Sequence, residues 1–382
     1  MNKEINKKIN ILVSFGTRPE GIKLAPVIKQ IKKKKDIFNL VVCSTGQHKE
    51  MLDQVLDFFE IKPQVFLNLM TENQTLNSLS SRILLEIDKV FLEVRPDVLL
   101  VQGDTTTAFL TALAAYYRKI RVGHVEAGLR TFNKFNPYPE ELNRQLISRL
   151  ADFNFTPTEN SYNNLKNEGI DPKSIFLTGN TIVDALEWGI KKIEKNKDKV
   201  ESKDLFRSID PAKKLILVTM HRRESFGEDI KNVCLALKIV AEKYKDVQIV
   251  YPVHLNPNVR KPVYEIVSNI NNIILTSPLD YESFIWLMCK SYFIVTDSGG
   301  VQEEAPTLKK PVIVIRKHTE RTESVKMGIS KLAGTETNSI VSSISDLLDS
   351  DNFYKKMIPV TNPYGDGKAS GKIVKIIYNF FK

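Results

Sequence analysis

The chain has 382 residues, of which 42% are hydrophobic and 26% are charged, and its formal net charge is +10. This length is enough for two average domains, and the composition is typical of a folded globular enzyme rather than a disordered chain. No apolar run approaches the roughly 18 residues of a membrane span, and the basic start leads into a strand without a signal-peptide pattern.

In the first half of the chain, short apolar runs alternate with longer amphipathic segments. This alternation predicts βαβ units and mainly parallel strands. The expected strands cover residues 10–16, 39–46, 97–104, 121–128 and 153–157. The expected helices cover residues 22–33, 48–59, 76–94 and 107–119.

The second half repeats this pattern, with strands expected at 215–221, 247–254, 272–278, 292–300 and 311–317 and a helix at 281–290. We therefore predict an α/β fold with two Rossmann-like domains that face each other across a cleft. The expected first domain is 1–186, with a C-terminal helix near 366–382 packing back on it. The lysine-rich stretch 187–210 is expected to be a linker, and 211–365 the second domain.

Unusual polar residues follow almost every expected strand at its carboxyl end, the edge where open α/β sheets bind ligands. These groups are Gly16-Thr17-Arg18, Gly103-Asp104, His124-Val125-Glu126, His221-Arg222-Arg223, His254, Asp297-Ser298-Gly299-Gly300 and Thr319-Glu320-Arg321. Because they share one end of the strands, we expect them to surround one ligand.

Three carboxylates in the first half are candidates for proton transfer. Asp104, taken alone, is better explained as the cap of the helix that follows it. Glu126 follows an apolar strand and precedes Gly128 and Arg130, and Glu140 begins a helix where a carboxylate is favourable for structural reasons alone. Several carboxylates on one rim would raise at least one pKa and so separate an acid from a base.

Other motifs suit phosphate. Arg18 and Lys23 follow a strand-to-helix turn, which is expected to offer unpaired backbone N–H groups to an anion. Ser298, Gly299 and Gly300 begin another helix, and Arg321 lies beyond a later strand. A carboxylate one turn further, Glu303 or Glu304, suits a ribose diol. His221 and Arg222 also suit phosphate better than a metal, since no second histidine lies at ligand spacing, whereas the lone His254 is more simply a structural histidine.

The positive charge also raises the possibility of nucleic-acid binding. Its densest runs, 32–35 and 191–199, lack interleaved aromatic residues and are better explained as solvated helix faces. The three widely spaced cysteines Cys43, Cys234 and Cys289 indicate reduced thiols rather than disulfides or a zinc site, which favours the cytoplasm.

Several motifs occur together and in order: GTRPE-x-IK-x-AP, GDTTT, HVEAGLRT, PEELNRQL, HRRES, DSGG-x-QEEAP and TER. In this set the chain closely resembles the non-hydrolysing UDP-N-acetylglucosamine 2-epimerases, from about Ile11 to Gly328. The resemblance implies the two-domain GT-B architecture and the interconversion of UDP-GlcNAc and UDP-ManNAc without an added cofactor or metal. UDP would be eliminated to give a 2-acetamidoglucal and then added back.

Carried over by motif, the resemblance implies acid and base roles for Asp104, Glu126 and Glu140, with His221 beside them. The residues implied to hold the nucleotide are Arg18, Lys23, His221, Ser298, Gly299, Gly300, Glu304 and Arg321, with Phe284 against uracil. UDP-GlcNAc as an activator would contact Gln47, Glu50, Arg222 and His254. The family also suggests a homodimer.

The chain departs from the family pattern at Gly21, Asn73, His318 and Thr322. Asn73 stands where some relatives have an arginine, and this departure leaves open whether UDP-GlcNAc activates the enzyme. The other three leave open a related UDP-sugar, of the 2,3-diacetamido or N-acetylfucosamine type. A GT-B glycosyltransferase is a further alternative, which would need an acceptor, and a basic nucleic-acid-binding protein is a non-enzymatic one.

Overall fold

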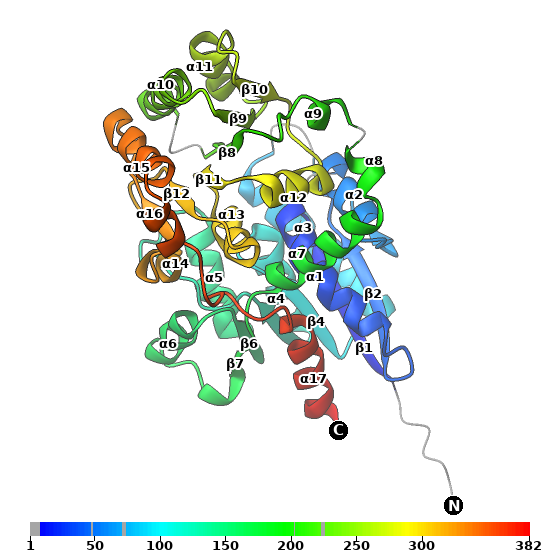
Figure 1. Ribbon diagram of the computed structural model, residues 1–382. Helices are drawn as coiled ribbons and strands as arrows, with labels where there is room; N and C mark the ends of the chain where they lie inside the picture. Colours follow the sequence, from blue (N-terminus) through cyan, green and yellow to red (C-terminus); the bar gives the residue numbers. More distant parts are fainter. Residues whose placement is uncertain (1–7, 47–48, 71–73, 202, 223–225) are drawn as a thin grey trace, which may run out of the picture. The chain divides into compact units, whose positions relative to one another are not determined.

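The computed structural model describes residues 8–46, 49–70, 74–201, 203–222 and 226–382. The chain divides into a first unit, Met1–Ala185 with Tyr364–Lys382, and a second unit, Leu186–Pro363. Each unit contains one fully parallel sheet with helices between its strands (Figure 1). The prediction of two Rossmann-like sheets is therefore confirmed.

The first unit has a seven-stranded sheet of order β3-β2-β1-β4-β5-β6-β7. Its strands are β1 Ile9–Phe15, β2 Phe38–Ser44, β3 Val65–Phe66, β4 Val98–Gln102, β5 Arg121–Val125, β6 Phe153–Thr156 and β7 Ile175–Leu177. Its helices are α1 Arg18–Lys32, α2 Lys49–Phe58, α3 Leu76–Val94, α4 Thr106–Tyr117, α5 Glu140–Leu150, α6 Glu159–Asn167 and α17 Ala369–Phe381, with the short η1 Pro172–Ser174.

Helices cover both faces of this sheet, because right-handed crossovers to either side of β1 place them on opposite faces. Helix α1 packs against α2 and α17 (Figure 1), while α4 packs against α3 and α5. Under α3 and α4, buried Leu12 and Leu99 of the sheet meet Ile87 and Phe91 of α3. The C-terminal helix α17 thus completes the first unit, and Phe380 packs edge-on against Phe153 at 5.0 Å between ring centroids.

The second unit has a six-stranded sheet of order β10-β9-β8-β11-β12-β13. Its strands are β8 Lys214–Thr219, β9 Val247–Pro252, β10 Ile273–Thr276, β11 Phe293–Thr296, β12 Val312–Val314 and β13 Ser330–Leu332. Its helices are α8 Lys197–Glu201, α9 Asp204–Arg207, α10 Glu228–Lys243, α11 Pro257–Val267, α12 Tyr281–Lys290, α13 Gly299–Glu304, α14 Thr322–Lys326, α15 Thr337–Asp349 and α16 Asp351–Lys356, with the short η3 Ala305–Leu308.

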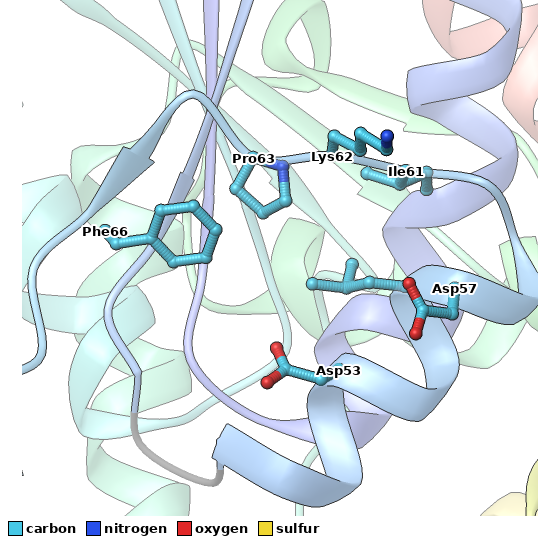
Figure 2. A pocket seen from close by; sticks show the side chains of 7 residues that line it. Asp53, Asp57, Ile61, Lys62, Pro63 and Phe66 are labelled. Carbon is cyan, nitrogen blue, oxygen red and sulfur yellow. The ribbon is translucent and has the colours of Figure 1, made fainter.

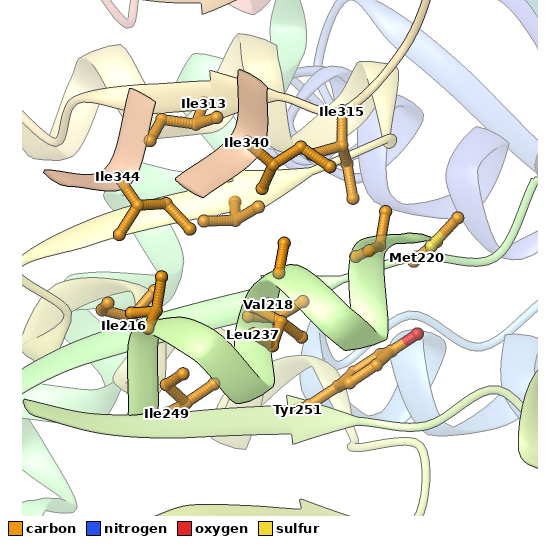
Figure 3. Packing of buried hydrophobic residues seen from close by; sticks show 14 of the residues in the cluster. Ile216, Val218, Met220, Leu237, Ile249, Tyr251, Ile313, Ile315, Ile340 and Ile344 are labelled. Carbon is orange, nitrogen blue, oxygen red and sulfur yellow. The ribbon is translucent and has the colours of Figure 1, made fainter. Parts of the chain in front are cut away.

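A single aliphatic cluster fills one face of the second sheet (Figure 3). Ile216 and Val218 of β8 and Ile249 of β9 belong to this cluster together with Leu237 of α10 and Ile340 of α15. The helices α10 and α15 also pack against each other. The branched side chains suit this layer, because they pack well against a pleated surface buried under helices.

The interval 187–210, predicted to be a linker, is mostly helical. Helix α7, Thr181–Lys195, begins in the first unit and ends in the second, and α8 and α9 follow it. Phe206 of α9 is buried against Trp286 of α12, with ring centroids 4.1 Å apart, and Lys203 donates to Asp280. The many lysines indicate a solvated segment, but Phe206 within it packs into the second unit.

Candidate active site

The strand order of the first unit brings three predicted groups to neighbouring strand ends. Gly16 follows β1, Gly103-Asp104 follow β4, and Glu126 follows β5, and these strands lie side by side as β1-β4-β5. Parallel strands end at the same edge of a sheet, so the three loops form one rim. We call this edge the carboxylate rim.

Glu126 has the most restrained geometry on the carboxylate rim. Its backbone has φ of 68°, a left-handed conformation that is uncommon for a residue other than glycine and that often marks functional sites. Its carboxylate pairs with the ammonium group of Lys23 on α1, and both side chains are only 7% exposed. The Nδ2 of Asn180 donates to the same carboxylate oxygen at 3.2 Å. Lys23 therefore contacts a predicted catalytic residue.

Asp104 is not the helix cap that its position suggests. The cap of α4 is Thr105, whose hydroxyl accepts from the backbone N–H of Ala108 at 3.0 Å. The Asp104 carboxylate instead lies 3.4 Å from Arg144 Nε of α5, and its backbone carbonyl accepts from Asn143 Nδ2 at 2.9 Å. The cap interpretation was wrong because the hydroxyl of the next residue, Thr105, takes that role.

Glu140 is the first residue of α5 and is half-buried. The next residue, Glu141, is fully buried and accepts from the backbone N–H groups of Thr131 and Phe132 at 3.0 and 3.1 Å. Arg144 reaches Glu141 at 3.3 Å as well as Asp104. Helix α5 therefore carries Glu140 and anchors Asp104 within the same unit.

The strand-to-helix turn after β1 differs from an open anion site. Buried Glu20 accepts from the backbone N–H groups of Gly16 and Thr17 at 3.0 and 2.8 Å and also from the hydroxyl of Thr105 at 2.8 Å. Burial raises the pKa of this carboxyl, although these hydrogen bonds oppose the shift. The expectation that this turn offers unpaired N–H groups is wrong for Gly16 and Thr17, while Arg18 lies half-buried at the start of α1.

His124 is a structural residue of the first sheet. It is completely buried in β5, and its Nε2 bonds the carbonyl of Gly103 at 2.7 Å. Burial lowers its pKa to about 3, with the charges of Arg130 and Arg144 acting in the same direction and the Gly103 carbonyl opposing. The imidazole is therefore neutral in the folded protein and fixes the backbone just before Asp104.

The second unit also gathers predicted residues at neighbouring strand ends, after β9, β8 and β11. We call this edge the cationic rim. Asp297, fully buried after β11, accepts from the backbone N–H groups of His221 and Arg222 at 3.0 and 2.9 Å. Its other oxygen lies 3.4 Å from His221 Nδ1, and the half-exposed His221 ring lies 6.3 Å from the ring of His254. Asp297 thus orients His221 at the rim.

The glycine turn after β11 lies against an arginine. Ser298 is the N-cap of α13, and a Cβ added at Gly299 would lie 2.8 Å from the guanidinium carbon of Arg321. That guanidinium also pairs with buried Glu303 at 2.9 Å. The lack of a side chain at Gly299 therefore permits the close approach of Arg321, and the carboxylate of Glu303 forms the ion pair that holds this arginine.

A carboxylate among arginines lies beside this turn. Burial alone would raise the pKa of Glu320, but the charges of Arg321 and Arg316, with a smaller contribution from Arg222, hold it well below its usual range. Arg316 Nη1 donates to Glu320 at 2.9 Å. The second unit thus fixes several guanidinium groups at one edge, an arrangement that suits a diphosphate.

Glu304 differs from Glu303 in its partner. It is buried and accepts from the hydroxyl of Tyr281, the first residue of α12, at 2.9 Å. Phe284, predicted to contact uracil, lies on the same helix three residues later and is half-buried. The structure therefore brings Glu304 close to the start of the helix that carries Phe284.

The residues expected to hold an activator are only partly described. Gln47 and the side chain of Glu50 lie outside the described part of the chain. Arg222 and exposed His254 adjoin His221 in the second unit. Asn73, one of the departures from the family pattern, also lies outside the described residues, whereas an alanine in place of Gly21 would press on Leu52 at 2.7 Å.

A shallow hollow in the first unit lies between the end of α2 and the segment leading to β3 (Figure 2). Its labelled lining residues are Asp53, Asp57, Ile61, Lys62, Pro63 and Phe66. No residue predicted for the site lines it. Within the described part of the chain, no three His, Cys, Asp or Glu side chains are grouped to hold a metal ion. Nor is any helix there both long and apolar enough to cross a bilayer.

Two parallel sheets of Rossmann-like order, one rimmed by carboxylates and the other by cations and a glycine turn, define a two-domain α/β protein of the GT-B-like class. The family model for UDP-N-acetylglucosamine 2-epimerase matches residues 29–378. The chain belongs to the UDP-N-acetylglucosamine 2-epimerase family, a family of isomerases.

Relatives match over nearly the whole chain. The UDP-N-acetylglucosamine 2-epimerase of Campylobacter jejuni is 52% identical, over 96% of this chain and 97% of its own. The crystal structure of UDP-GlcNAc 2-epimerase from Neisseria meningitidis, bound to UDP-GlcNAc, is 47% identical with a TM-score of 0.93, covering 97% and 100% of the two chains. The Methanocaldococcus jannaschii enzyme, in complex with UDP-GlcNAc and UDP, is 34% identical with a TM-score of 0.83, covering 98% and 100%.

Proposed function

We propose that this chain interconverts UDP-GlcNAc and UDP-ManNAc by eliminating UDP and adding it back. The observation that carries the proposal is the restrained carboxylate of Glu126, which is held at the carboxylate rim by Lys23 and Asn180. A carboxylate fixed by buried partners suits proton transfer at a defined carbon atom. The activity in the names of the relatives is consistent with this chemistry.

The reaction needs two proton-transfer groups on opposite faces of C2. A base removes the C2 proton, the C–H electrons form the C1–C2 double bond, and the C1–O bond breaks as UDP leaves with its electron pair. A proton then returns to the other face of C2, and UDP adds back at C1. We assign these two roles among Asp104, Glu126 and Glu140, all of the first unit. No redox change occurs, so the step needs no cofactor.

The second unit is proposed to hold the UDP anion. Ser298, Gly299 and Gly300 would contact phosphate through the glycine turn, and Arg321 would add a charge-assisted contact. His221, oriented by buried Asp297, would hold or protonate the departing oxygen. Glu304 and Phe284 are assigned to the ribose and the uracil, and Arg18 to the phosphates from the first unit.

The test is incubation of the purified chain with UDP-GlcNAc alone, followed by NMR identification of every sugar nucleotide formed. We expect an equilibrium mixture of UDP-GlcNAc and UDP-ManNAc with no acceptor present. Free ManNAc as the main product would indicate a hydrolysing enzyme instead. If UDP-GlcNAc stays unchanged while a 2,3-diacetamido or N-acetylfucosamine-type UDP-sugar is epimerised, the related substrate is the right one. An absolute need for an acceptor would favour a glycosyltransferase.

Activation by UDP-GlcNAc, assembly as a homodimer and a cytoplasmic location complete the proposal. Arg222 and His254 support activation, since both adjoin His221. The free thiols of Cys43, Cys234 and Cys289 support a cytoplasmic location. UDP-ManNAc conversion that begins only when UDP-GlcNAc is added would support activation. Light scattering at working concentration distinguishes a dimer of about twice 43.5 kDa from a monomer.

A further inference from the structure

Asn180 is a buried polar residue of the first unit that no motif of the family resemblance includes. It immediately precedes α7 and is only 2% exposed. Its backbone N–H donates to the carbonyl of Tyr364 at 2.7 Å, and its side-chain oxygen accepts from the backbone N–H of Ile182 at 3.1 Å. Its side-chain nitrogen donates to Glu126 Oε2 at 3.2 Å. The backbone N–H, the side-chain oxygen and the side-chain nitrogen of Asn180 thus each have a hydrogen-bond partner.

These partners fix which way round the amide lies. The backbone N–H of Ile182 can only donate, so the amide oxygen must face it. The amide nitrogen, which can only donate, then faces the carboxylate of Glu126. A flipped amide would place two donors together at Ile182 and two acceptors together at Glu126, so the observed orientation is the favourable one.

The backbone around both residues is held by tertiary contacts of the same unit. Gly179, with φ of 91°, lies beside the returning C-terminal segment, where an added Cβ would meet Gly365 Cα at a van der Waals distance of 3.4 Å. On the other side, the residue after Glu126, Ala127, donates its N–H to the carbonyl of Phe155 at 3.0 Å. The hydrogen bond between Asn180 and Glu126 therefore joins two backbone segments that are each fixed.

We propose that Asn180 is a positioning residue for the epimerisation. It sets the orientation of the Glu126 carboxylate relative to the C2–H bond of the sugar, while Lys23 supplies the compensating charge. The segment that begins at Tyr364 contributes indirectly, because it holds the backbone of Asn180. This inference rests on the proposed function, since it assigns Asn180 a part in the same reaction.

Two substitutions test it. Asn180→Asp keeps the size of the side chain and the acceptor for Ile182, but it loses the donor to Glu126 and places a second carboxylate beside it. Asn180→Ala removes both side-chain hydrogen bonds. We expect kcat to fall about 10- to 100-fold in each variant, the range that a misplaced catalytic group can cost, while KM for UDP-GlcNAc and the affinity for UDP stay within about twofold of wild type.

A matched control is Asn154→Ala, because Asn154 is also a fully buried asparagine of the first unit, and its amide nitrogen donates to the backbone carbonyls of Ser148 and Ala151. It should lower the thermal midpoint but leave kcat near wild type. A purely structural role for Asn180 predicts near-normal kcat in Asn180→Asp, and that result would overturn the inference. Wild-type enzyme that fails to epimerise UDP-GlcNAc would instead overturn the proposed function.

Discussion

The carboxylate rim of the first unit and the cationic rim of the second occupy equivalent edges of two similarly ordered parallel sheets, yet their chemistry is opposite. On the carboxylate rim, Glu126 adopts a left-handed backbone and is restrained by two buried partners. On the cationic rim, Gly299 allows Arg321 to approach the turn, and Asp297 orients His221.

This difference shows that the topology places loops at one edge but does not decide what they do. Loop residues decide it. A carboxylate on a left-handed backbone, with fixed partners, suits a reaction that needs one defined geometry. Guanidinium groups beside a glycine turn suit the binding of an anion. We therefore expect substitutions on the two rims to separate into losses of rate and losses of nucleotide affinity.

The largest effect is expected from Glu126→Gln on the carboxylate rim. The amide keeps the shape of the side chain but can neither take nor give the C2 proton, so kcat should fall roughly 10²–10⁴-fold. Steady-state kinetics with UDP-GlcNAc would measure the fall, and calorimetry should show an unchanged affinity for UDP. Asp104→Asn and Glu140→Gln should lower kcat on the same scale.

Glu93→Gln in α3 is a useful control, because this exposed carboxylate of the first unit lies outside the rim. It should leave kcat unchanged. A Glu126→Gln variant that loses UDP affinity but keeps its rate would contradict the separation of the two rims.

The next largest effect is expected from Arg321→Ala on the cationic rim. Loss of a charge-assisted contact to phosphate costs about 1.5–3 kcal/mol, which is roughly tenfold or more in UDP affinity. Calorimetric titration with UDP measures the loss, and Lys331→Ala, which removes a half-buried pair with Asp346 in the same unit, is the control. Equal UDP affinity in the Arg321→Ala and Lys331→Ala variants would mean that this arginine does not bind the nucleotide.

A smaller effect concerns the stability of the folded protein in acid, through His124 beside the carboxylate rim. Because burial lowers the pKa of His124 to about 3 in the folded chain, the unfolded chain binds more protons below pH 6.5. The neutral His124 should therefore cost about 2 kcal/mol of stability between pH 7 and pH 5, a loss that grows as the pH falls toward 3.

Urea unfolding at both pH values, compared for wild type and His124→Asn, measures this difference. The variant should be less stable at pH 7 but should lose less stability on acidification. His318→Asn, at an exposed histidine of the second unit, should behave like wild type. Parallel pH dependence of wild type and His124→Asn would mean that His124 is not the group that titrates.

The sequence predicted both sheets and the strand-end positions of the candidate residues, because apolar runs and local motifs encode them. It missed β3, β7 and β13, which have two or three residues each and carry no readable period. The equally short β12 was predicted because it lies in the longer apolar run 311–315. The sequence also missed the contacts of Asn180 and Arg144. Asn180 meets Glu126 across 54 positions of chain, and Arg144 meets Asp104 only through the packing of α5, so no local pattern reveals either contact.

The same limit explains the errors. Thr105 took the cap predicted for Asp104, and Glu20 took the N–H groups of the turn at Gly16. In both cases a side chain within four positions of the predicted site accepts the hydrogen bonds from these backbone N–H groups. Only the folded geometry shows which acceptor binds them. In the lysine-rich interval 187–210, the charge is visible in the sequence, whereas the packing of Phe206 against Trp286 is not.

The central claim is that the C2–H bond of the sugar is broken and remade by carboxylates of the first unit. The most direct measurement is epimerisation of UDP-GlcNAc in deuterated water, followed by mass spectrometry and NMR of both sugar nucleotides. Carboxyl protons exchange with solvent, so UDP-ManNAc should carry deuterium at C2, and recovered UDP-GlcNAc should gain it with time. Epimerised product that carries only protium at C2 would contradict the account.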